Sequence, residues 1–128
     1  MRLNLLSLLL LAISIPSYSA GSAGVAVTSE YVWRGQKQSN GAAVQAEISH
    51  EVMKNLTLGL WTSTISGGKS ENDITANYSF SIADGHSINV GAIGYLYVTG
   101  STSNTLEANL GYSSPWFELQ VYNTSDYL

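Results

Sequence analysis

Residues 24–35 read Gly-Val-Ala-Val-Thr-Ser-Glu-Tyr-Val-Trp-Arg-Gly, and this stretch decides the fold. Every second residue from Val25 to Trp33 is apolar, apart from Ser29, and the residues between them are mostly small or polar. Successive side chains of a β-strand point to opposite faces, so the stretch predicts a strand with one apolar and one polar face. Its length suits a strand that crosses a membrane at a tilt.

The same alternation recurs six more times along the chain. The segments are residues 42–52, 56–65, 73–82, 87–98, 105–113 and 117–124. Hairpin-length connections join them, and the Asp84-Gly85 pair is a strong hairpin signal. Parallel strands would need a long crossover, which is absent from this sequence. The sequence therefore predicts an all-β fold, an antiparallel up-and-down meander of about seven strands.

Composition narrows the class of protein further. The chain has 128 residues, which is enough for one domain, and no cysteine, so it has no disulfide framework and no thiolate metal site. Charged residues make up 11% of the chain and the formal net charge is −4. Nucleic acid is excluded as a partner, because no basic stripe is available to neutralise phosphates.

The first twenty residues have the layout of a secretory signal peptide. A positive start at Arg2 precedes an apolar run that ends at Pro16, and small residues follow. We expect cleavage within residues 19–23. The apolar run is shorter than the roughly 20 residues that a transmembrane helix needs.

Two further patterns favour a barrel in a membrane over a soluble sheet. Connections after the first, third and fifth strands are longer than the others, as in outer-membrane barrels with short periplasmic turns. Aromatic residues on the apolar face fall near strand ends, with aliphatic residues between them, which predicts two girdles at the lipid interfaces. These lipid-interface aromatics are Tyr31, Trp33, Tyr78, Phe80, Tyr112 and Phe117.

Residues 27–41, Val-Thr-Ser-Glu-Tyr-Val-Trp-Arg-Gly-Gln-Lys-Gln-Ser-Asn-Gly, resemble the opening strand and first loop of the TorF family of bacterial outer-membrane porins. Residues 58–63 and 106–112 resemble later strands of that family, in the same order. The resemblance implies an outer-membrane barrel with a channel role and supplies no catalytic residues. Family members are longer, and outer-membrane barrels commonly end in a strand with a terminal aromatic residue.

Seven strands are an odd number, whereas bacterial single-chain barrels have an even number of eight or more. The last residues, 126–128, also read as a loop. We therefore expect residues 24–128 to supply the strands of an incomplete barrel and the chain to be a fragment. An open edge in lipid leaves backbone groups without partners, so we expect no stable closed barrel from this chain alone.

The polar face supplies candidates for a pore lining. They are Glu30, Arg34, Gln45, Glu47, Trp61, Asp73, Asn77, Asn89, Tyr95, Tyr97, Glu107, Asn109 and Glu118. Acidic residues outnumber Arg34, so a water-filled pore with this lining would prefer cations. Hairpin geometry also predicts that Glu30 lies close to Glu47, where like charges would raise one pKa.

Other motifs carry little chemistry. Gly67-Gly-Lys-Ser70 is similar to the end of a phosphate loop, but Ser63 replaces its first glycine and no helix follows. His50 and His86 are too few for a metal centre. A lipid-modifying enzyme built on His50 would need neighbours that a strand turns to the opposite face. We expect no enzymatic activity, no catalytic residue, no metal and no cofactor.

The sequence thus predicts a porin-like passive channel for small solutes or ions, located in the bacterial outer membrane after export through the periplasm. Its expected partners are membrane lipid, small solutes or ions, and the barrel-assembly machinery. Two alternatives remain, a secreted soluble β-sheet binding module and a non-conducting barrel with a structural or adhesive role. The sequence leaves the oligomeric state open.

Overall fold

The computed structural model describes residues 11–16, 21–98 and 103–125, and all secondary structure in these residues is β-strand. Within these ranges there is no helix long and apolar enough to cross a membrane. The strands are β1 (Leu11–Pro16), β2 (Gly21–Thr28), β3 (Val32–Trp33), β4 (Gln36–Lys37), β5 (Ala43–Met53), β6 (Leu56–Ile65), β7 (Lys69–Ala83), β8 (His86–Val98), β9 (Thr105–Ser113) and β10 (Glu118–Ser125).

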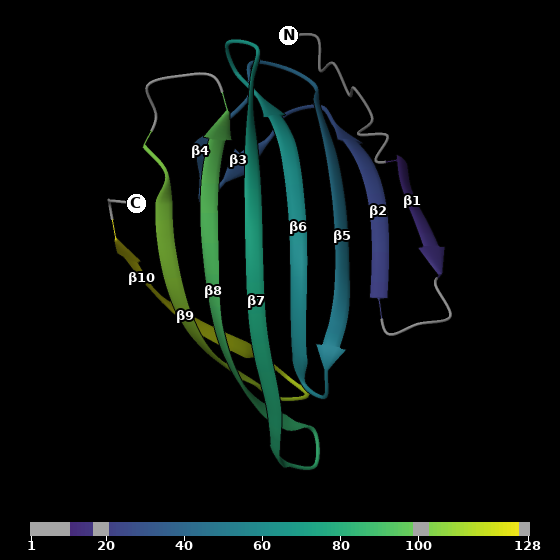
Figure 1. The fold of residues 1–128 in the computed structure, drawn as a ribbon, viewed down its shortest axis with the longest axis vertical. Coiled ribbons are helices and arrows are strands. Elements are labelled where there is room, and N and C mark those ends of the chain that lie inside the picture. Colours follow the sequence, from purple (N-terminus) through teal and green to yellow (C-terminus); the bar gives the residue numbers. More distant parts are fainter. Residues whose placement is uncertain (1–10, 17–20, 99–102, 126–128) are drawn as a thin grey trace, which may run out of the picture.

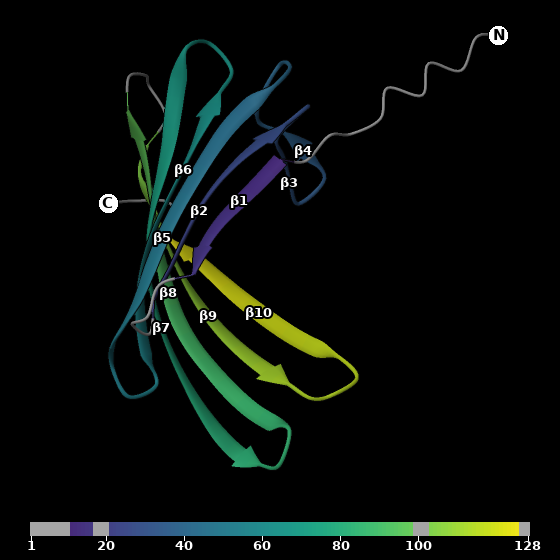
Figure 2. The same cartoon turned by 90° about the vertical axis from the view of Figure 1, so that its right-hand side faces the viewer.

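Eight of these strands form one antiparallel meander in the order β1-β2-β5-β6-β7-β8-β9-β10, and β3 pairs only with β4. The sheet is open, because β1 and β10 are its two ends and do not pair. Figure 1 places the β6–β7 turn at the upper end of the sheet and the β5–β6 and β7–β8 turns at the lower end. Figure 2 shows that the sheet curves into a trough, with β3 and β4 on its concave side.

The predicted meander is confirmed, and most predicted strands match the observed ones closely. The fourth strand is the exception among them, since β7 begins at Lys69 and not at Asp73. Residues Lys69 and Glu71 pair with Ile65 and Ser63 of β6, so the connection shrinks to residues 66–68. The predicted long loop after the third strand is therefore wrong.

The predicted first strand, residues 24–35, is also wrong at its C-terminal end. Pairing with β5 stops at Thr28, opposite Ala43, and the Thr28 hydroxyl then hydrogen-bonds to the carbonyl oxygen of Glu30 at 3.0 Å. Beyond this point the chain leaves the sheet and forms the short β3–β4 hairpin, which comprises residues 31–38. Alternation alone does not reveal this exit, because the apolar period continues through Trp33.

Part of the predicted signal peptide, residues 1–10 and 17–20, lies outside the described residues. Its central segment forms β1, which pairs along β2 from Leu11 opposite Val27 to Pro16 opposite Ser22. Removal of residues 1–20 would leave β2 at the edge of a seven-stranded sheet.

The convex face of the sheet is apolar and exposed. Leu58, Val90 and Leu110 from three different strands are 44%, 47% and 51% exposed. Their register partners, such as Ala76 opposite Leu58, are apolar as well. Backbones of the described strands approach each other closely only within the β3–β4 pair and between neighbours in the sheet, so no second layer of the described chain covers this face.

The buried residues are mostly polar, and the apolar ones among them are few. In the described part of the chain the buried polar residues are Ser39, Ser63, Glu71, Glu107 and Asn109. The buried apolar or aromatic ones are Tyr31, Ala43 and Tyr95. Soluble proteins usually bury apolar side chains and expose polar ones, so this distribution is the reverse of a soluble core.

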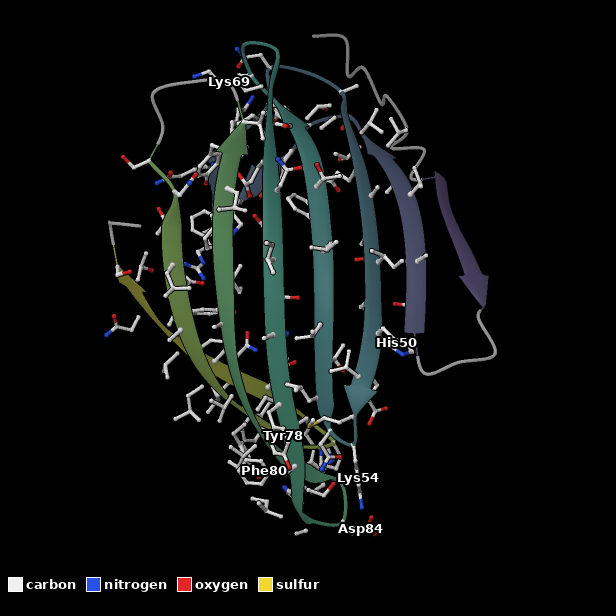
Figure 3. All side chains as sticks on the ribbon, in the orientation of Figure 1. His50, Lys54, Lys69, Tyr78, Phe80 and Asp84 are labelled. Atoms are coloured by element: carbon white, nitrogen blue, oxygen red, sulfur yellow. The ribbon has the colours of Figure 1, made fainter. Side chains whose placement is uncertain are left out.

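Of the six aromatic residues predicted for the apolar face, four lie at the lower end of the sheet, on or beside the exposed face. Tyr78 and Phe80 lie on the exposed face at the lower end of β7, as Figure 3 shows. Their rings contact each other, and Tyr112 contacts Phe117 with ring centroids 5.9 Å apart. The predicted upper girdle is wrong, because Tyr31 and Trp33 leave the sheet with the β3–β4 hairpin and turn inward.

Two glycines in turns allow a test of the hairpin geometry. Gly85 and Gly68 both have positive φ values, +71° and +68°, which cost a residue with a side chain about 1 kcal/mol or more. A Cβ atom at Gly85 would also lie 2.9 Å from Cγ of Pro115, whereas one at Gly68 would meet no atom within 4 Å. We expect Gly68→Ala to lower the free energy of unfolding by about 1 kcal/mol and Gly85→Ala to lower it further.

Guanidinium unfolding of both variants in detergent, followed by tryptophan fluorescence, measures this difference. Equal losses in the two variants would contradict the observed approach of the β9–β10 turn to Gly85.

Candidate functional site

The strand residues predicted to line a pore share the concave face of the sheet. Residues directly opposite each other in neighbouring strands project to the same side. One row joins Glu47, Trp61, Asp73 and Tyr95, and the row above it joins Gln45, Ser63, Glu71 and Tyr97. Asn77 and Asn109 flank Gly91, and Asn89 lies opposite Gly111. Glu107 and Glu118 occupy the same face of β9 and β10.

The β3–β4 hairpin crosses this concave face from β6 to β10. Tyr31 lies edge-on against Trp61 of β6 at 5.4 Å, and Trp33 lies edge-on against Tyr95 of β8 at 5.9 Å between ring centroids. Figure 2 shows the hairpin on the open side of the trough. Successive hairpin residues thus contact successive strands, and the hairpin fills the upper part of the trough.

Arg34, at the tip of the hairpin, forms a two-pronged ion pair with Glu107. Its Nη1 and Nη2 atoms donate to Oε2 and Oε1 of the carboxylate at 3.0 and 2.9 Å. The Glu107 side chain is fully buried, and it also accepts hydrogen bonds from Tyr95 at 3.1 Å and Thr124 at 2.9 Å. Paired donors of this kind match the planar carboxylate and fix the position of the hairpin.

Two aromatic rings enclose the Arg34 guanidinium. Its Cζ atom lies 4.2 Å from the ring centroid of Trp33 and 4.1 Å from that of Tyr122. The hydrogen bonds to Glu107 raise the pKa of Arg34 above its ordinary value. Arg34 therefore remains a cation, and its charge is stabilised by the ion pair with Glu107 and by cation–π contacts with two rings.

The base of the hairpin is held by a second set of contacts. Tyr31 donates its phenol to Oε1 of Glu71 at 3.0 Å, and its backbone N–H bonds to the Ser39 hydroxyl at 2.8 Å. Burial, together with the negative charge of Glu71, raises the pKa of Tyr31. The Ser66 N–H and hydroxyl both bond to the carbonyl oxygen of Gln38, which ties the hairpin to the β6–β7 turn.

Glu71 is the buried acid of this site without a cationic partner. It is 3% exposed and accepts a hydrogen bond from the Tyr31 hydroxyl at 3.0 Å, and Tyr97 lies opposite it in β8. Salt bridges in the described part of the chain join only Arg34 to Glu107 and Lys37 to Glu30. Asp73, next on the same face, has a buried Oδ1 atom with no hydrogen-bond partner, and so does Asn109.

A cavity of about 270 Å³ lies between the hairpin and the sheet. The hairpin contributes Trp33, Gln36 and Gln38, and the sheet contributes Glu71, Tyr95 and Tyr97 among others. Its volume is slightly below the range of roughly 300–1,000 Å³ that is typical of drug-sized pockets. The arrangement can hold a small solute between aromatic faces, amides and a carboxylate.

Glu30 does not lie where the sequence analysis expected it. It pairs with Lys37 across the hairpin at 2.6 Å, and Glu47 lies opposite Gly24 in the middle of β2. The predicted Glu30–Glu47 proximity is therefore wrong, because the chain leaves the sheet before Glu30. His86 contacts the Tyr112 ring and hydroxyl, at 2.6 Å from its Nδ1 atom. The described residues contain no group of three acidic or histidine side chains able to hold a metal.

Sequence reasoning missed Glu71 and the inward position of the hairpin. The sequence analysis places Glu71 in a loop. Glu71 nevertheless continues the alternation of Asp73 and Thr75, which is the signal that the predicted strand 73–82 begins earlier. The inward turn of Tyr31 and Trp33 has no comparable signal, because the ring partners are far away in the sequence.

A family model described as "Bacterial protein of unknown function (Gcw_chp)" matches residues 16–124, which is most of the chain. The chain belongs to this family. No curated protein and no solved structure matches it significantly. The matched Gcw_chp region includes the hairpin, Glu71 and Glu107, so the whole candidate site lies within it.

In this Gcw_chp protein, Arg34→Met tests the ion pair that holds the hairpin. The change leaves the Glu107 carboxylate buried without its cation, so we expect the free energy of unfolding to fall by roughly 2 kcal/mol. Guanidinium unfolding in detergent, followed by fluorescence, measures the loss.

Lys37→Met is the matched control, because it removes the other ion pair of the hairpin, which is largely exposed. Surface pairs contribute roughly 0–1 kcal/mol, so this variant should remain close to the parent protein. An Arg34→Met variant as stable as Lys37→Met would show that the buried pair does not hold the hairpin.

Proposed function

We propose that the chain supplies transmembrane strands of a bacterial outer-membrane β-barrel that acts as a narrow, porin-like channel for small solutes or ions. The observation that carries this proposal is the exposed apolar convex face, opposite a polar and partly buried concave face. A strand sheet in lipid turns its apolar residues outward to the hydrocarbon and its polar residues toward the lumen. The resemblance of residues 27–41 to the TorF porins agrees with this function.

The exposed aromatic cluster at the lower end of the sheet fits the same proposal. Tyr78, Phe80, Tyr112 and Phe117 form adjoining ring contacts on or beside the convex face. Aromatic rings with a polar edge are favoured at the membrane–water interface. This cluster would set the depth of the lower rim in the bilayer.

Closure of the barrel needs pairing for the free edge of β10 and for the edge at the other end of the sheet. All eight residues of β10 are exposed. In hydrocarbon, each unpaired backbone group costs several kcal/mol, so a stable barrel requires further strands at these edges. We propose that additional strands, from the same polypeptide or from another copy, complete the wall.

The concave face would form the lumen, and the β3–β4 hairpin would narrow it. The acidic strand residues of this face are Glu47, Glu51, Glu71, Asp73, Glu107 and Glu118. The positive charge of Arg34 is already matched by Glu107. Acidic rings favour cations in other channels, so we propose a cation preference.

One observation favours a second candidate function, a barrel that does not conduct. The hairpin packs against β6, β8, β9 and β10 through rings and an ion pair, as an occluding element would. A soluble binding module, in contrast, would leave its apolar rows in water, and the long row of exposed Val, Leu and Ile residues weighs against it.

Membrane insertion is tested by placing a charge on each face of β7. Ile74 is on the exposed apolar face, so Ile74→Arg should cost about 2–4 kcal/mol in a bilayer and reduce the amount of protein in the outer membrane. Thr75→Arg adds the same charge on the concave face and should be tolerated. Expression from the complete coding sequence in a Gram-negative host, followed by membrane fractionation and a heat-modifiability gel, measures both variants.

A soluble module would give the opposite pattern. Ile74→Arg would then be neutral, and both variants would appear in the periplasm without detergent.

Conductance is tested by the reversal potential of the purified protein in a planar bilayer with a KCl gradient. We expect the sign that corresponds to cation preference, and Glu47→Lys should shift the potential toward anions because Glu47 is on the concave face. Asp84→Asn is the control, since Asp84 is in the lower β7–β8 turn, as Figure 3 shows. An anion preference in the parent protein would contradict the proposed lining, and absence of conductance would favour the non-conducting barrel.

A further inference from the structure

The cavity beneath the β3–β4 hairpin is lined by aromatic rings, amides and a carboxylate. Trp33, Tyr95 and Tyr97 present aromatic rings, Gln36 and Gln38 present amides, and Glu71 presents a carboxylate. The hairpin contributes half of these side chains and the sheet contributes the other half, so the cavity exists only because the hairpin folds inward.

The charge of the cavity is the feature that selects a ligand. Arg34 is the cation next to Trp33 in the sequence, and both of its terminal guanidinium nitrogens already donate to Glu107. Glu71 is 3% exposed, the Tyr31 hydroxyl donates a hydrogen bond to it, and no salt bridge of the described chain includes it. Ionising a buried carboxyl group without a cation nearby is costly, so a ligand that brought a positive charge would bind favourably there because it would stabilise the ionised carboxylate.

The three rings point to an organic cation and not to a bare metal ion. Ammonium and guanidinium groups are attracted to aromatic faces, and their N–H groups donate to carboxylates and amide oxygens. The described residues lack the third acidic or histidine ligand that a metal site would need. The volume of about 270 Å³ limits the ligand to a small molecule.

We propose that this cavity is a binding site for small organic cations that carry a primary ammonium or guanidinium group. Glu71 receives the charged group, the rings of Trp33, Tyr95 and Tyr97 surround it, and Gln36 contacts it from the hairpin. The inference rests on the proposed channel function, for which it names the solute class, but binding itself requires only the folded protein and no conductance.

The test is isothermal titration of the detergent-solubilised full protein with butylammonium chloride, compared with butanol and with glucose. We expect saturable binding of butylammonium and at least about tenfold weaker binding of butanol, because a charge-assisted hydrogen bond is worth roughly 1.5–3 kcal/mol. Binding of butanol equal to that of butylammonium would overturn the proposal, and so would a preference for glucose.

Variants at the cavity wall sharpen the test. Glu71→Gln should weaken butylammonium binding at least about tenfold, whereas Asp84→Asn should leave it unchanged, because Asp84 is an exposed acid in the β7–β8 turn and does not line the cavity. Circular dichroism and the heat-modifiability gel report whether each variant is folded. Equal effects of the two substitutions would overturn the assignment of Glu71.

Gln36 provides a second pair of variants that does not disturb a buried group, because its side chain is exposed on β4. Gln36→Lys should weaken butylammonium binding and Gln36→Glu should strengthen it. Unchanged binding in both variants would overturn the proposed site. Binding without conductance would refute the channel and leave the site intact, whereas conductance without binding would refute the site alone.

Discussion

Everything in this structure follows from a single curved sheet whose two faces have opposite polarity and which has no second layer in the described chain. Period-two alternation places Leu58, Val90 and Leu110 on the convex side, and each remains about half exposed. In water such a large exposed apolar face would promote aggregation. In a bilayer the same face would be stable against the hydrocarbon chains. The polarity of the surroundings is therefore the condition on which the fold depends.

The concave side is organised by polar contacts and not by an apolar core. Glu107 is fully buried, and Arg34, Tyr95 and Thr124 together satisfy its oxygens. A buried polar network of this kind favours one position of the hairpin on the sheet, because a shift of the hairpin would leave the Glu107 carboxylate without its partner. The β3–β4 hairpin is thus held by chemistry that works only when it lies against β8, β9 and β10.

The hairpin also changes how the concave face is interpreted. Tyr31 and Trp33 belong by pattern to the apolar face, and in the structure they contact Trp61 and Tyr95 on the opposite face. In the upper part of the trough, Trp33, Glu71 and Glu107 line a partly open cavity between the hairpin and the sheet.

The sequence by itself determined the class of fold, the antiparallel meander and the face of nearly every strand residue, because these depend only on local alternation and short turns. The positions of Gln45, Asp73 and Asn109 on the polar face needed no further information. Only the tertiary structure decided that the first strand ends at Thr28 and that Arg34 meets Glu107, 73 residues away. Such contacts depend on the curvature of the whole sheet, which brings distant strands under one hairpin and which no local pattern encodes.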